Sequence, residues 1–181
     1  MMGRHRTFVG CLLCVAISCS LYAQAVDQAK AESSAREFVK QFYDWYVATT
    51  VNGSLPVGGY PVALKEKSHV FDPVLLRALK EDHASQKRTP GELVGLDFDP
   101  FLNTQDPSNL YRVGLVTRKG NHYWVEVSAI PSDTKTSGPD VIAEVVQKKG
   151  HWHFVNFHYP GDGDLLSTLK SLREERNKSL E

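Results

Sequence analysis

The densest group of side chains able to do chemistry lies between residues 97 and 106. Its carboxylates are Asp97, Asp99 and Asp106, and two side-chain amides lie among them. Carboxylate and amide oxygens are the ligands that calcium takes, but this stretch lacks the turn glycine and terminal glutamate of an EF-hand loop. We therefore expect a structural loop in which the aspartates accept backbone N–H groups and Phe98 and Phe101 pack on the core. Calcium binding is the alternative.

A second group of candidates lies on the predicted strands. The possible acid–base residues are Glu126, Glu144 and His158, with His122 and Asn156 on the same strands. A general base needs a shifted pKa and hydrogen-bond reach to its substrate, and the sequence pattern supplies neither. His151 and His153 could give two zinc ligands from one strand face, but no third ligand is indicated. The sequence thus predicts no metal and no cofactor.

The N-terminal segment has the layout of a secretory signal peptide. Arg4 and Arg6 precede an apolar run over residues 8–17, and Ala23-Gln24-Ala25 forms an A-x-A cleavage site. The apolar run is shorter than the roughly 20 residues that cross a bilayer. We expect residues 1–25 to be removed, leaving residues 26–181 as one exported domain in the periplasm or outside the cell.

A second possible export signal overlaps the first. Ala16-Ile17-Ser18-Cys19 resembles the lipobox of a bacterial lipoprotein, although leucine is usual where Ala16 stands. Use of this signal would attach a lipid to Cys19 and tether the domain to a membrane. Cleavage after Ala25 is the preferred interpretation.

Composition excludes several classes of protein. All three cysteines precede Ala25, so the mature domain has no disulfide and no cysteine nucleophile. Loss of Arg4 and Arg6 leaves 19 basic against 21 acidic residues, a net charge of −2. Without a basic stripe, the chain is not expected to bind nucleic acid. It also contains no G-x-S-x-G, H-E-x-x-H or phosphate-loop motif.

Helical periodicity precedes strand periodicity along the mature chain. A helix is predicted over residues 27–49, a loop over 51–61, and a second helix from Asp72-Pro73 to about Gln86. The inner face of the first helix is expected at Ala31, Ala35, Phe38, Phe42 and Trp45 or Tyr46, widened by Val39 and Tyr43. That of the second is expected at Val74, Leu75, Ala78 and Leu79.

The period changes to two after a long connection over residues 89–109. Two hairpins are predicted, with turns at Gly120-Asn121 and Lys149-Gly150, and a loop over residues 131–139 separates them. In the last strand, Phe157 and Tyr159 should share a face with His151 and His153, and Phe154 should lie on the other with Trp152 and His158. A closing helix should bury Leu165, Leu166, Leu169 and Leu172. This order predicts an α+β fold.

The stretch D-x-D-P-F-L-x-x-Q-D at residues 97–106 resembles a bacterial exported family of unknown function. The aromatic first helix precedes it, and the sheet containing Gly150-His151-Trp152-His153-Phe154 follows it. The family is similar to the NTF2-like, or cystatin-like, superfamily. The resemblance implies N-terminal helices packed on a curved antiparallel sheet that forms a cone, with a C-terminal helix. It implies no catalytic residues.

These observations favour a non-enzymatic binding or accessory module of the cell envelope. Its partner would be an envelope protein or a small apolar ligand. One alternative is a cone-cavity isomerase or dehydratase that uses Glu126, Glu144 or His158. The other is an immunity or inhibitor protein.

Overall fold

The computed structural model describes residues 10–53, 59–88, 94–130 and 138–178, with the backbone alone for residues 10–24. Its helices are α1 (Gly10–Thr50), α2 (Tyr60–Glu66), the 3₁₀ turn η1 (Ser68–Val70), α3 (Pro73–Arg88) and α4 (Leu165–Lys178). Its strands are β1 (Leu110–Lys119), β2 (His122–Ile130), β3 (Val141–Lys148), β4 (His151–Tyr159) and β5 (Gly163–Asp164).

The strands form one open antiparallel sheet in the order β1-β2-β3-β4-β5. Both predicted hairpins are present, and their turns use backbone of positive φ at Gly120, Lys149 and Gly150. Left-handed backbone of this kind matches the twist of paired strands, and glycine adopts it without a steric penalty. The α+β class predicted from the sequence is confirmed.

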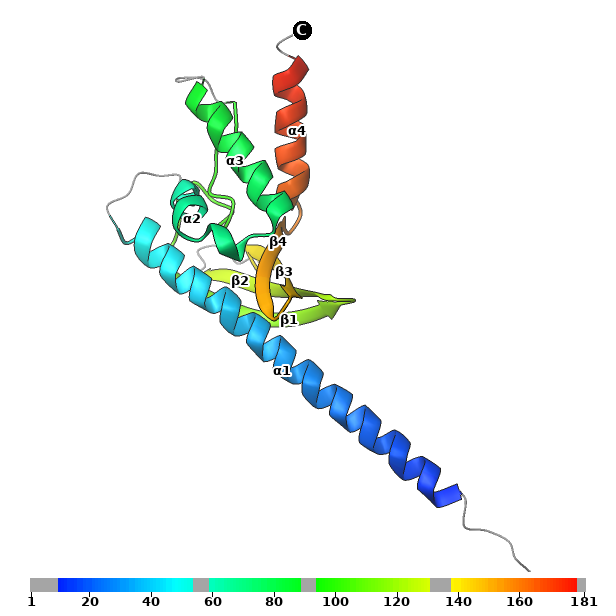
Figure 1. Cartoon of the computed structure of the whole chain (residues 1–181). Coiled ribbons are helices and arrows are strands. Elements are labelled where there is room, and N and C mark those ends of the chain that lie inside the picture. The colour runs from blue at the N-terminus through cyan, green and yellow to red at the C-terminus, as the bar shows by residue number, and fades with distance from the viewer. Residues whose placement is uncertain (1–9, 54–58, 89–93, 131–137, 179–181) are drawn as a thin grey trace, which may run out of the picture.

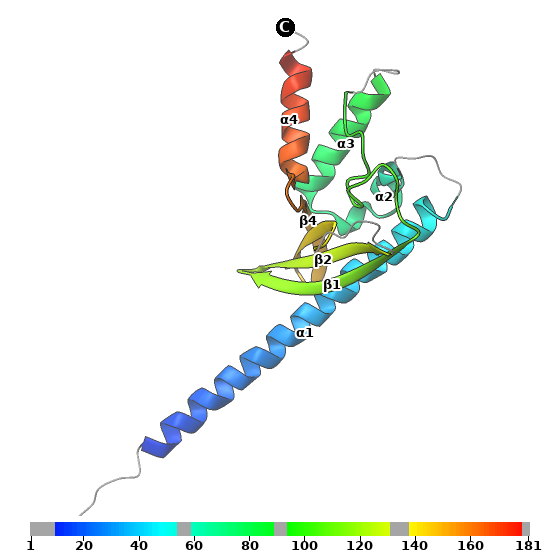
Figure 2. The same cartoon turned by 180° about the vertical axis from the view of Figure 1, so that it is seen from behind.

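Helix α1 lies along one face of the sheet and continues well beyond it, whereas α3 and α4 lie side by side and project away from the sheet (Figures 1 and 2). The core between α1 and the sheet is aromatic. The ring of Phe42 packs edge-on against Phe71 and Phe101, with centroids 5.8 and 5.4 Å away. It also lies 4.8 Å from Phe154 of β4. Such contacts join segments far apart in the sequence into one core.

The predicted inner face of α1 is confirmed at Ala35, Phe42 and Tyr46, but its centre lies closer to the tyrosines than expected. Val39, Tyr43 and Tyr46 are almost fully buried, whereas Phe38 and Trp45 are only partly buried. The cause is the loop at residues 99–102, because the hydroxyls of Tyr43 and Tyr46 donate to Phe101 O and Asp99 Oδ2, each over 2.6 Å. The helix therefore turns its tyrosines toward that loop.

Two features of the helical region differ from the prediction. The loop expected over residues 51–61 ends at Tyr60, where α2 begins with Pro61 in its first turn, a favourable position for proline. In α3, Val74 is 64% exposed rather than inward, while Leu75, Leu79, Asp82 and Ser85 are buried. The inner face of α3 is thus partly polar, which an apolar stripe does not reveal.

Two β-bulges change which strand residues face the core. The register shift between Val113 and Val116 of β1 leaves Leu115 59% exposed and buries Val116. In the β3–β4 pair, Glu144 lies opposite Asn156, but Val145 lies opposite Phe154. One extra residue in β4 therefore brings Phe154 and Phe157 into the same core, so the predicted placement of these rings on opposite faces was wrong.

The closing helix buries Leu165 and Leu169, with Leu166 and Leu172 partly buried against the core. The connection over residues 94–109 contains no helix or ladder strand, whereas residues 89–93 and most of the predicted loop at 131–139 lie outside the described residues. Within the part of the chain that the structure describes, no helix combines the length and apolar composition needed to span a membrane.

Candidate functional site

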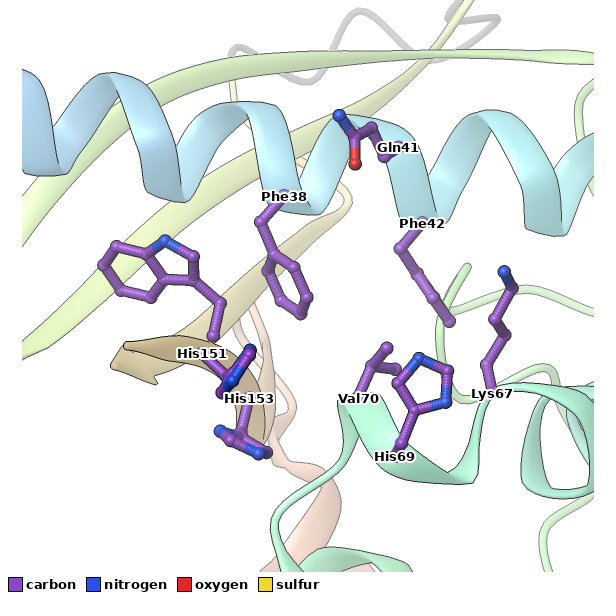
Figure 3. A pocket seen from close by; sticks show the side chains of 9 residues that line it. Phe38, Gln41, Phe42, Lys67, His69, Val70, His151 and His153 are labelled. Carbon is purple, nitrogen blue, oxygen red and sulfur yellow. The ribbon is translucent and has the colours of Figure 1, made fainter. Parts of the chain in front are cut away.

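A groove lies where α1, η1 and the start of β4 meet. Its first cavity has a volume of about 590 Å³ and is lined from all three elements (Figure 3). Side chains that line it include Phe38 and Phe42 of α1, Lys67 and Val70 at η1, and His151 and Trp152 of β4. We call this cavity the apolar lobe, because each of the three elements contributes an aromatic or aliphatic side chain to its wall.

A second cavity of about 840 Å³ adjoins the apolar lobe, since His69 and His153 line both. It lies between η1, the first turns of α3 and β4. Arg77 and Lys80 of α3 line it, and Glu81 is the acidic residue in its wall. We call this cavity the basic lobe, and the two lobes together the groove.

The segment between η1 and α3 is fixed to β4 by its backbone. Asp72 N–H donates to Phe154 O over 2.8 Å, and Phe71 forms an isolated bridge with Phe154. The Asp72 carboxylate accepts the Val74 N–H of the first turn of α3 and also pairs with Lys148, 2.5 Å away. Burial opposes ionisation of Asp72, but the bonds from Lys148 and Val74 hold its pKa below the ordinary value. These contacts set the shape of the groove.

Histidines surround the junction of the lobes. Figure 3 shows His69 on the η1 side, with His151 and His153 on β4 across from it. The Nδ1 atom of His153 is buried and has no hydrogen-bond partner among the described residues. Nearly all buried polar atoms in proteins are paired, so this nitrogen is an exception. It has almost no accessible surface, and His153 lines the groove through its other atoms.

The structure brings Glu144 and His158 together in a separate cluster. His158 Nε2 lies 2.7 Å from Glu144 Oε2, and His122 Nδ1 lies 2.5 Å from Glu144 Oε1. The bond with His158 lowers the pKa of Glu144, and the bond with His122 adds to this effect, while burial opposes it. The carboxylate therefore links two imidazoles across three strands.

This cluster lies on the sheet face opposite the core. Its neighbours on β2 and β3, Val125 and Val145, are fully buried on the other face. The His158 ring stacks on Trp124 at 4.0 Å, and Lys119 Nζ lies 3.2 Å from the Trp124 ring. Neither the apolar nor the basic lobe contains these residues.

Glu126 shares that sheet face but is not part of the cluster. It forms no hydrogen bond to Glu144 or His158 within the described chain. Glu126 lies beside Gly114 of β1, where an added Cβ would be 3.6 Å from the Glu126 Cβ. Of the three acid–base candidates, the structure thus places two together.

In the acidic stretch, only Asp99 has the expected structural role. Its Oδ1 accepts the N–H groups of Phe101 and Leu102, at 2.9 and 3.2 Å. Burial raises the Asp99 pKa to about 6, although its hydrogen bonds act in the opposite direction. Asp97 and Asp106 are exposed, and in the described chain their carboxylates accept no backbone N–H.

The structure gives no support for metal coordination by these side chains. Within the described ranges, no group of three histidine, cysteine, aspartate or glutamate side chains could hold a metal ion. The groove itself was not predicted from the sequence. Lys67 and His69 lie in a segment without periodicity or motif, and Phe38 had been assigned to the core.

Comparisons of the chain with models of protein families, with curated proteins and with solved structures gave no match. The groove and the outer cluster of Glu144 are the two features of the described chain that could have a function.

Proposed function

We propose that this chain is an exported, non-enzymatic binding module of the bacterial envelope that holds a small apolar ligand in the groove. The observation that carries the proposal is the apolar lobe, a cavity of about 590 Å³. Four aromatic or aliphatic side chains line it, namely Phe38, Phe42, Val70 and Trp152, together with Gln41, Lys67 and three histidines. Ligand sites in proteins are concave, largely apolar and about 300–1,000 Å³ in volume. The signal-peptide layout of residues 1–25 supports export.

The proposal includes membership of the NTF2-like superfamily. Its support is the D-x-D-P-F stretch at residues 97–101, together with α1 packed on an antiparallel sheet and a C-terminal helix. The aromatic side chains of Phe42, Phe101 and Phe157 fill the space between α1 and the sheet. In this proposal the ligand therefore binds beside the core rather than within it.

A cone-cavity isomerase or dehydratase is the second candidate. It is favoured by the pairing of Glu144 with His158, because a carboxylate that orients an imidazole is a common arrangement for a general base. However, both side chains lie on the outer sheet face and line neither lobe of the groove. The binding function agrees better with the location of the cavities.

The test uses phenylnaphthylamine, an uncharged apolar dye whose fluorescence rises in apolar surroundings. We expect saturable binding to residues 26–181. Gln41 lines the apolar lobe and is exposed, so Gln41→Trp should fill the lobe without removing core side chains and weaken binding about tenfold, or ~1.4 kcal/mol.

The matched control is Gln105→Trp, at an exposed loop residue outside both lobes. It should leave dye affinity unchanged. The proposal fails if the wild-type chain does not bind the dye, or if the two tryptophan variants bind it equally well.

A further inference from the structure

We infer that the ligand of the groove is an amphipathic anion, with its apolar body in the apolar lobe and its acidic headgroup in the basic lobe. This inference rests on the proposed function and adds the chemical class of the ligand. Two observations carry it: the charges around the groove, and the lack of acidic partners for those charges among the described residues.

The basic lobe has a small excess of positive charge, and Phe71, Pro73 and Leu76 also line it. Arg77 and Lys80 line it together with two histidines, against the single carboxylate of Glu81. That carboxylate also lies 3.9 Å from Arg173 of α4, so part of its charge is already offset. The chain as a whole has equal numbers of basic and acidic residues. The groove therefore concentrates positive charge that the composition does not require.

Among the described residues, the cations of the groove have no acidic partners. In the described chain, Arg77 and Lys80 form no ion pair or side-chain hydrogen bond, and Lys67 lies over the Trp45 ring at 5.1 Å instead. Elsewhere, structural cations do have carboxylate partners, as Lys148 has in Asp72 and Arg176 in Asp82. Unpaired cations beside a cavity favour an anionic ligand.

The junction of the lobes offers one further polar position. His153 lines both cavities, and its buried Nδ1 has no partner in the described chain. His153 thus lies between Phe38 and Phe42 of the apolar lobe and Arg77 and Lys80 of the basic lobe, where an amphiphile would change from apolar to charged.

Neither an apolar nor a purely ionic ligand uses the whole groove. An uncharged hydrocarbon would leave Arg77 and Lys80 without counter-charge, whereas a small inorganic anion would leave Phe38 and Val70 in contact with water. Each lobe alone has the volume of a small-molecule site, so an elongated ligand can occupy both. A carboxylate and a phosphate headgroup both satisfy this chemistry.

The experiment compares two dyes with the same apolar body, phenylnaphthylamine and its sulfonated analogue, anilinonaphthalene sulfonate, on residues 26–181. We expect the sulfonate to bind about tenfold more tightly, and this preference to decrease with added salt. The double variant Arg77→Glu/Lys80→Glu should weaken sulfonate binding at least about tenfold and phenylnaphthylamine binding less than about twofold.

The matched control is Arg112→Glu/Lys87→Glu, which makes the same charge change at two exposed residues outside both lobes. It should change neither affinity by more than about twofold. Displacement of the sulfonate by dodecanoate, dodecyl phosphate and dodecanol then distinguishes carboxylate from phosphate headgroups. Both acids, or one of them, should displace the dye at concentrations where dodecanol does not.

Two results would overturn the inference. If both dyes bind equally and the charge-reversed variant matches the control, the groove is an apolar site without preference for anions, and the proposed function stands without this inference. If dodecanol displaces the sulfonate as effectively as the two acids do, the groove likewise has no preference for anions. If neither dye binds, the proposed function fails as well.

Discussion

Asp99 has the most extensively hydrogen-bonded carboxylate of the loop over residues 97–106. It accepts the Tyr46 hydroxyl and the N–H groups of Phe101 and Leu102, and it is 7% exposed. Burial nevertheless raises its pKa from 3.8 to about 6. The native state therefore binds a proton more tightly than the unfolded chain does. The contribution of Asp99 to stability is largest below pH ~4 and decreases as the pH rises through ~6.

We predict that Asp99→Asn abolishes this pH dependence. The amide keeps an oxygen for the two backbone N–H groups and cannot ionise. Between pH 4 and 7, the free energy of unfolding of the wild type should fall relative to the variant by about 2 kcal/mol. Urea denaturation at both pH values measures this change. A difference between the two proteins that is independent of pH would contradict the raised pKa.

The pKa of Glu144 is lowered, chiefly by the bond with His158. Glu144 therefore contributes to stability above its unfolded pKa near 4.5, and this contribution is lost as the pH falls through the folded pKa. Glu144→Gln should lower the free energy of unfolding by about 1 kcal/mol at neutral pH. Glu126→Gln, on the same face of the sheet, should lower the free energy of unfolding by less than ~0.5 kcal/mol.

A double-mutant cycle with His158→Gln measures how much of the Glu144 effect depends on that pair. Additive losses would show that the two side chains do not interact in solution.

At the scale of elements, α4 is attached to α3 through a buried ion pair. Arg176 Nη1 lies 2.9 Å from Asp82 Oδ1 and also donates to Val94 O. Asp82 is fully buried and accepts Leu96 N–H as well, at 3.2 Å. Loss of the arginine would leave a buried carboxylate without its counter-charge, which is far more costly than loss of an exposed pair.

We therefore predict that Arg176→Ala lowers the free energy of unfolding by about 3 kcal/mol. The matched control is Arg173→Ala, one turn earlier in α4, whose pair with Glu81 is half-exposed and 3.9 Å long. It should cost less than ~0.5 kcal/mol. Equal losses in chemical denaturation would contradict the role assigned to Asp82.

The sequence predicted the long helices and the four long strands but not α2 or η1. It also failed to predict which residues face the core wherever a bulge or a polar contact intervened. Hairpin turns at Gly120 and Gly150 are local signals, so both were predictable. The bulge that places Phe154 and Phe157 on one side depends on pairing with β3, and alternation within β4 alone cannot show it. Asp82 looks like a surface residue until its partner 94 positions later is known.

At the scale of the whole molecule, the groove was not predicted because it joins segments that are far apart in the sequence. The Asp72 N–H bond to Phe154 O holds the segment of His69 against β4, and Phe38 of α1 packs 4.9 Å from the Phe154 ring. The pair of Glu144 and His158 was closer to prediction, since both residues lie on adjacent strands of one predicted hairpin. Acid–base candidates could thus be named from the sequence, whereas the cavity could not.

The long α1 helix includes part of the proposed signal peptide and also packs on the sheet. Residues 25–30 are exposed, and contacts with the rest of the domain include Ser34 with Trp152 and Arg36 with Gly114 O. The helix runs past the sheet toward its N-terminal end (Figure 2). The contacts of Ser34 and Arg36 would therefore remain after cleavage behind Ala25, whereas a cut after Phe38 would open both the core and the groove.

We predict that a bacterial host exports the full chain and releases a mature protein that begins at Val26. Its unfolding midpoint should equal that of a directly expressed chain of residues 26–181, while removal of residues 1–38 should prevent folding, because Phe38 packs 4.9 Å from Phe154. Mass spectrometry of the exported protein identifies the N-terminus. A lipid-modified Cys19 would establish the tethered form instead, and an unprocessed cytoplasmic chain would contradict export and remove the envelope from the proposed function.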